Sequence, residues 1–147
     1  MAPFYETREG VSYWRVTERE MMSMFGTILM GRLHAQHIIY PMRSEHNRTT
    51  YGRIDIAKAV YALYKQEKYS KNPGASEGTD LTGFHGILPS HEYEEMKTMG
   101  WWDDVNNKMS AKWGMPLDFL IHSFVREVDR HGARGYSLTR GGKPSRK

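Results

Sequence analysis

Cysteine is absent from the 147-residue sequence. This absence excludes disulfide bonds, iron–sulfur clusters, cysteine-ligated zinc and thiol nucleophiles. Long apolar runs are absent as well, because the most apolar stretch, 21–39, is interrupted by Arg32, His34, Gln36 and His37. Such a stretch does not suit a transmembrane helix. The first ten residues combine two acidic side chains with no apolar run, which is not typical of a secretory signal. We therefore expect an intracellular protein, in the cytoplasm or, if a presequence has been removed, in an organellar matrix.

The positive charge of the chain is concentrated near its end. There are 21 Lys and Arg against 17 Asp and Glu, which gives a formal net charge of +4. Residues 133–147 contain no acidic side chain and hold five of the cations, namely Arg134, Arg140, Lys143, Arg146 and Lys147. Without these five, 16 basic residues face 17 acidic ones, so the rest of the chain is nearly neutral. Because the segment is rich in glycine and serine and poor in apolar residues, we predict a flexible basic tail.

The first helix is predicted from a capping signal. Residues 17–20 read Thr-Glu-Arg-Glu, a capping box in which the Thr and Glu side chains bind free backbone N–H groups. Apolar residues then recur at spacings of three and four until Pro41, which predicts a helix over 18–38. Gly26 and Gly31 each cost this helix up to about 1 kcal/mol relative to Ala. We interpret both glycines as positions where another part of the backbone packs closely.

The rest of the chain predicts more helices and no certain strand. Ser90 is interpreted as a helix N-cap and Gly100 as the residue that follows the C-terminus of the same helix. The strongest apolar stripe begins after Pro116 and continues through Phe124. Apolar periodicity and end signals together predict four helices after the first, over 53–68, 91–99, 101–113 and 116–131.

The predicted fold is all-α. We expect a small irregular bundle of four to five helices in a helical domain over 17–132. An extended N-terminal arm over 1–16, with a short strand near 11–16, precedes it, and the basic tail over 133–147 follows it. The polar stretches 42–52 and 70–80 are predicted to be loops.

Three histidines are the weak candidates for metal binding. His34 and His37 are three residues apart on the predicted first helix, and His46 follows beyond Pro41. Three imidazoles are a possible ligand set for a transition metal. No His-Glu-x-x-His motif or carboxylate at a suitable spacing accompanies them, so we favour histidines that are exposed or hydrogen-bonded. No catalytic residue and no cofactor are predicted, and we expect that the protein is not an enzyme.

Two features are interpreted as partner-binding. Trp101 and Trp102 are consecutive, so on a helix their side chains point about 100° apart, and one of them is expected at an interface. The five tail cations offer charge that complements phosphate or an acidic protein surface.

These features favour a non-catalytic subunit or accessory protein of a larger assembly, such as a ribonucleoprotein or an organellar complex. The alternative is a cellular or viral nucleic-acid-binding protein whose tail neutralises phosphates. A small metalloenzyme that uses the histidines is the second alternative.

Overall fold

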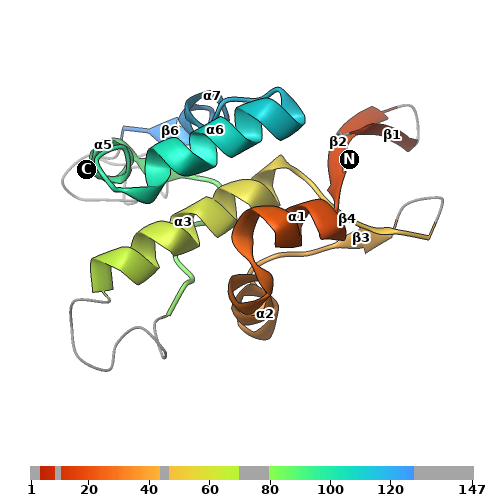
Figure 1. Cartoon of the computed structure of the whole chain (residues 1–147), viewed down its shortest axis with the longest axis horizontal. Coiled ribbons are helices and arrows are strands. Elements are labelled where there is room, and N and C mark those ends of the chain that lie inside the picture. The colour runs from red at the N-terminus through yellow and green to blue at the C-terminus, as the bar shows by residue number, and fades with distance from the viewer. Residues whose placement is uncertain (1–3, 9–10, 44–46, 70–79, 128–147) are drawn as a thin grey trace, which may run out of the picture.

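The computed structural model describes residues 4–8, 11–43, 47–69 and 80–127, which form two small sheets and several helices (Figure 1). The larger sheet has four antiparallel strands in the order β1-β2-β4-β3. Its strands are β1 (Phe4–Arg8), β2 (Val11–Thr17), β3 (Met42–Arg43) and β4 (Thr49–Tyr51). The prediction of an all-α fold is therefore wrong, because the chain is mixed α/β. The prediction of a short strand near 11–16 matches β2 closely.

The hairpin formed by β1 and β2 extends away from the rest of the sheet (Figure 1). β1 pairs with residues 11–15 of β2, whereas β4 pairs with β2 only at Val16 and Thr17. The buried Arg15 strengthens this short connection. Its guanidinium donates to Thr50 Oγ1 at 3.1 Å and to the Thr50 carbonyl at 2.8 Å. The strand pairs and this side chain together attach β2 to β4. β3 and β4 both lie within 42–52, so the prediction that this whole stretch is a loop is wrong.

The predicted helix over 18–38 is in fact two helices, α1 (Glu18–Phe25) and α2 (Thr27–Ala35). The cap at Thr17 is confirmed, since its side chain accepts a hydrogen bond from the Glu20 N–H at 3.3 Å. Gly26 separates the helices because its backbone adopts φ 89° and ψ 155°, a conformation that essentially only glycine accepts. An added Cβ at Gly26 or Gly31 would meet no atom within 4 Å, so the predicted close backbone packing is wrong.

The longest helix described, α3 (Arg53–Tyr69), crosses the middle of the molecule (Figure 1). The prediction of 53–68 is confirmed to within one residue. Helices α1 and α2 lie on one side of it, and α5, α6 and α7 lie on the other. Asp55 fixes the beginning of α3, because its carboxylate accepts hydrogen bonds from the Gly52 N–H at 3.3 Å and the Tyr40 N–H at 3.2 Å.

The C-terminal half departs most from the sequence prediction. Ser90 is the first helical residue after Pro89 and makes no cap, and Gly100 precedes the next helix with a right-handed φ of −62°. The helix predicted over 116–131 is found over Leu117–His122, and beyond it the Phe124 carbonyl accepts the Leu88 N–H at 2.9 Å. Residues 128–131 of this prediction lie outside the described residues. The elements are β5 (Leu88–Pro89), α5 (Ser90–Met96), α6 (Trp101–Trp113), α7 (Leu117–His122) and β6 (Val125–Arg126). β5 and β6 form the second sheet, a parallel pair.

One hydrophobic core joins the two halves of the chain. Trp14 of β2 and Trp113 of α6 meet edge to face, with ring centroids 6.0 Å apart. This arrangement is favourable for aromatic rings and places the hairpin base against the C-terminal helices. None of the helices in the described ranges is both long and apolar enough to cross a bilayer.

Candidate docking surface

The residues predicted to bind a partner lie in two places. The five tail cations, Arg134, Arg140, Lys143, Arg146 and Lys147, are outside the described residues. Trp102 is buried and meets the Tyr93 ring edge to face at 6.3 Å. Trp101 is partly buried, and its indole N–H is buried without a hydrogen-bond partner. Of the two tryptophans, only Trp101 therefore keeps some surface for a partner.

Two of the three weak candidates for metal binding, His34 and His37, lie within the described residues. His34 lies on α2 and forms a 2.8 Å hydrogen bond through Nε2 with the Tyr51 hydroxyl. His37 lies beyond the end of α2, with a left-handed φ of 56°, so the two do not share a helix. His46 is outside the described residues. Within the described ranges, no three His, Asp or Glu side chains form a group that could hold a metal ion.

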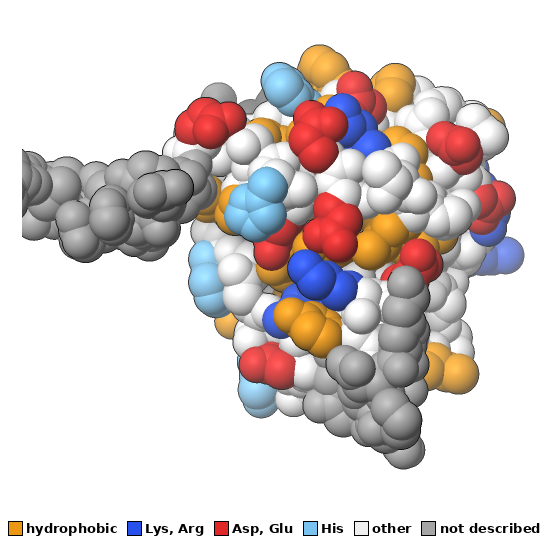
Figure 2. Space-filling model, turned by 90° about the vertical axis from the view of Figure 1, so that its left-hand side faces the viewer, with side chains coloured by type: hydrophobic (Ala, Val, Ile, Leu, Met, Phe, Trp, Pro, Cys, Tyr) orange, Lys and Arg blue, Asp and Glu red, His pale blue; other side chains and the backbone are white. Residues whose placement is uncertain are grey.

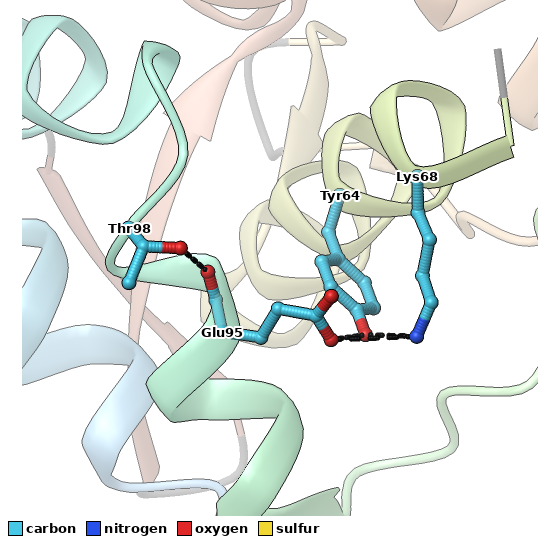
Figure 3. Close-up of polar contacts among 4 residues, drawn as sticks. All are labelled: Tyr64, Lys68, Glu95 and Thr98. Carbon is cyan, nitrogen blue, oxygen red and sulfur yellow. Dashed lines mark hydrogen bonds and ion pairs between the residues drawn. The ribbon is translucent and has the colours of Figure 1, made fainter. Parts of the chain in front are cut away.

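A polar network joins the C-terminal part of α3 to α5 (Figure 3). The Tyr64 hydroxyl donates to Glu95 Oε1 at 2.7 Å, and Lys68 Nζ donates to the same hydroxyl at 3.0 Å and to Glu95 Oε1 at 3.3 Å. Thr98 Oγ1 donates to the Glu95 carbonyl at 2.7 Å. Burial and the Glu95 carboxylate raise the pKa of Tyr64 to about 12, although Lys68 opposes this shift. A phenol that stays protonated at neutral pH is no general base, so the network serves to hold α5 against α3.

The surface around this network is mixed in charge. Figure 2 looks onto the end of the molecule where α3 ends and α5 begins, and acidic side chains are spread across it with basic ones between them. Charges of α3 and α5 are paired in this region of the fold, with Lys68 Nζ 3.3 Å from Glu95 Oε1, and Lys97 just after α5 lies 3.2 Å from Glu94. A surface of this kind is typical of solvated helices and gives no sign of selecting one ligand.

A small hollow between α1 and α6 is also mixed in charge. It is lined by Arg19, Glu20, Ser23 and Lys112. The buried Glu20 carboxylate accepts a hydrogen bond from Trp113 Nε1 at 3.3 Å, so this carboxylate already has a structural role. Its negative charge opposes the binding of an anion between the two cations.

Exposed apolar side chains occur at several places, such as Ile28 on α2 and Phe119 on α7, and one group of them lies beside the beginning of α3. Ile54 and Lys58 are one turn apart on α3 and therefore share a face of the helix. The Tyr40 ring lies 5.0 Å from Lys58 Nζ. Gly86 lies close to Ile54, since a Cβ added to Gly86 would lie 3.8 Å from Ile54 Cδ1, and Ile87 is the next residue in the sequence. We call this group, Tyr40, Ile54, Lys58 and Ile87, the Tyr40 surface.

The apolar members of the Tyr40 surface have considerable area open to solvent. Tyr40 is 62% exposed, Ile87 39% and Ile54 36%, and Met42 on the neighbouring edge strand β3 is 37% exposed. The side chain of Lys58 is held in place, since Nζ donates to the Ile38 carbonyl at 2.9 Å. Single exposed apolar residues are normal, but neighbouring ones mark a surface that a partner can cover.

The charges around the Tyr40 surface are mostly positive. Arg43 of β3, Arg48 just before β4 and Arg53 at the start of α3 are all exposed. Among the described residues of 40–58, Asp55 is the one acidic side chain, and it is buried. Burial raises the pKa of Asp55, while the Tyr40 and Gly52 N–H groups oppose that change. The exposed charges among these described residues are therefore cationic.

No family model, curated protein or solved structure matches this chain. The functional argument therefore depends on the geometry of this surface. Sequence reasoning missed the Tyr40 surface, because its members come from three separate segments. One signal was present: Ile54 is an apolar residue off the apolar stripe that begins at Ile56.

Proposed function

We propose that this protein is a non-catalytic subunit of a larger protein assembly, and that it docks through the Tyr40 surface and its basic C-terminal residues. The observation that supports the proposal is the exposure of Tyr40, Ile54 and Ile87, with the Lys58 ammonium held 5.0 Å from the Tyr40 ring. Apolar and aromatic anchors within a polar rim are the usual composition of a protein–protein interface. A tyrosine with most of its ring exposed is the residue type that most often contributes a large share of the binding energy.

A pair of matched substitutions tests this proposal. Ile54→Glu places a charge in the middle of the Tyr40 surface, and Ile28→Glu makes the same change at an isoleucine of α2 that is 80% exposed. The full-length protein should be purified under native conditions from its own source and sized by native mass spectrometry. We expect wild type and Ile28→Glu to remain in one defined complex and Ile54→Glu to be released from it. The melting temperatures of the free variants show whether each substitution leaves the fold intact.

Nucleic-acid binding is a second candidate that one observation favours. Arg43, Arg48 and Arg53 are exposed cations in the same stretch of the chain as the exposed Tyr40, and cations combined with an aromatic ring suit a single-stranded nucleic acid. The five tail cations could add up to a log–log salt slope of about −4.5 on duplex DNA. Deletion of 133–147 separates the two candidates. We expect the deletion to weaken attachment of the protein to its complex. We also expect the intact chain to bind RNA or DNA only weakly at about 150 mM salt.

A further inference from the structure

We infer that the partner segment bound by the Tyr40 surface is a polypeptide segment that combines acidic and apolar side chains. This inference rests on the proposed function and adds the chemistry of the partner. It follows from how apolar and cationic groups are arranged on the same small area.

The apolar part of the surface is centred on the first turns of α3. Ile54 lies in the first turn, Gly86 lies close to its side chain, and the Tyr40 ring lies beside Lys58 one turn further along the same face. An aliphatic or aromatic side chain of a partner that covers Ile54 would bury apolar area there. Burial of apolar area of this kind is the main favourable term in association.

The cationic part lies directly beside the apolar part. Lys58 Nζ is held between the Ile38 carbonyl and the Tyr40 ring, and an ammonium has three N–H donors. One donor is used by the Ile38 carbonyl, so others are available to a carboxylate. Because this lysine is already ordered, the loss of side-chain entropy on binding is reduced.

The wider charge distribution favours the same partner. Arg53 lies next to Ile54 in sequence, and its guanidinium is fixed over the Trp14 ring at 5.5 Å. Arg43 and Arg48 add exposed positive charge near the strands, while Asp55, the one acidic side chain among the described residues of 40–58, is turned inward to backbone donors. Exposed charge of one sign among these described residues favours partners of the opposite sign and speeds their association.

A polypeptide suits the surface better than a nucleic acid does. Ile54, Ile87 and Met42 are aliphatic, and bases stack on aromatic rings or guanidinium groups. Tyr40 is the one exposed aromatic ring among the described residues of this surface. Aliphatic neighbours instead complete a pocket for apolar side chains of a protein partner.

The test uses four fluorescent probes against the full-length protein, with binding measured by anisotropy. The first probe is a short peptide that alternates Asp or Glu with Leu or Phe. The second replaces its acidic residues with Lys, the third replaces its apolar residues with Ala, and the fourth is a single-stranded RNA of similar charge. We expect the acidic apolar peptide to bind at least about tenfold more tightly than each of the others.

Matched variants separate a specific site from general electrostatic attraction. Lys58→Glu and Lys112→Glu change the net charge equally, and Tyr40→Ala and Phe119→Ala each remove an exposed aromatic ring. We expect Lys58→Glu and Tyr40→Ala to weaken binding about tenfold and the other two less than about twofold. Equal losses for both lysine variants, or tighter binding of the RNA, would overturn the inference.

A second variant guards against a folding defect, because Lys58 also binds the Ile38 carbonyl. Lys58→Gln keeps a donor and removes the charge. It should therefore fold normally and still bind the acidic peptide several-fold more weakly than wild type does. Unchanged binding by a folded Lys58→Gln contradicts the inference. If Ile54→Glu is released from the native complex but the wild-type protein shows no preference for the acidic peptide, this inference is contradicted and the proposed function is not. Retention of Ile54→Glu in the complex would contradict the proposed function as well.

Discussion

Trp113 and Glu20, which are 93 residues apart, are joined by a 3.3 Å hydrogen bond from the indole Nε1 to Oε1. Both side chains are buried, so the bond joins α1 to α6 inside the molecule. The same tryptophan also packs on Trp14 of the hairpin. This one side chain therefore connects the sheet, the first helix and the C-terminal helices.

The two indole groups of α6 give a matched prediction. Trp113→Phe leaves the buried Glu20 carboxylate without this donor, and we expect a loss of about 1–3 kcal/mol beyond the effect of the smaller ring. Trp101→Phe removes an indole N–H that has no partner, so it avoids this penalty. Chemical unfolding of both variants gives the comparison. Equal destabilisation of the two would show that the bond to Glu20 contributes nothing.

The two glycines near the junction of α1 and α2 are expected to respond in opposite directions. Gly31 is helical and has open space around it, so Gly31→Ala should stabilise the protein by up to about 1 kcal/mol. Gly26 has φ 89° and ψ 155°, and Gly26→Ala should cost about 1–3 kcal/mol. Thermal unfolding with circular dichroism measures both. A stabilising Gly26→Ala would mean that α1 and α2 form one continuous helix.

The buried tyrosines predict a loss of stability in alkaline solution. Burial is the main cause that raises the pKa of Tyr64 to about 12, and it also raises the pKa values of Tyr51, Tyr61 and Tyr93. Because the folded pKa is above the ordinary value of 10.0, the stabilisation is complete below pH 10. It is then lost as the pH rises through the folded pKa. Urea unfolding at increasing pH measures this loss in the free energy of unfolding. Tyrosinate absorbance over the same pH range reports the ionisation of the buried tyrosines.

A Tyr64→Phe variant assigns part of that effect to the network with Glu95. Without the phenol, the fall in stability between about pH 10 and 12 should be smaller than in wild type. A fall of unchanged size would mean that the other tyrosines account for all of it.

The sequence predicted the elements whose signals are local. Helix α6 was predicted with the bounds that it has, since its apolar face and Gly114 both lie within one short stretch. Gly114 indeed takes the left-handed conformation, at φ 66°. Helix α3 was predicted to within one residue for the same reason.

The elements that were missed depend on contacts between distant residues. The strands β3, β4, β5 and β6 have two or three residues each, too few to show a period. The apolar stripe through Phe124 looked helical, yet Phe124 packs edge to face on Phe84 at 5.7 Å and its carbonyl binds Leu88. The Tyr40 surface was missed for a similar reason, because only the tertiary fold brings the segments of Tyr40 and Gly86 to the beginning of α3.

Site-specific photo-crosslinking tests the central claim, that the Tyr40 surface binds a protein partner, most directly. A photoreactive phenylalanine analogue should replace Tyr40 in the full-length protein, and Phe119, which is 69% exposed on α7, is the matched control. Irradiation of the native complex should give one discrete protein adduct from position 40 and none from position 119. Ile54→Glu in the same chain should abolish that adduct. Equal labelling from both positions, or an adduct that survives Ile54→Glu, would contradict the account.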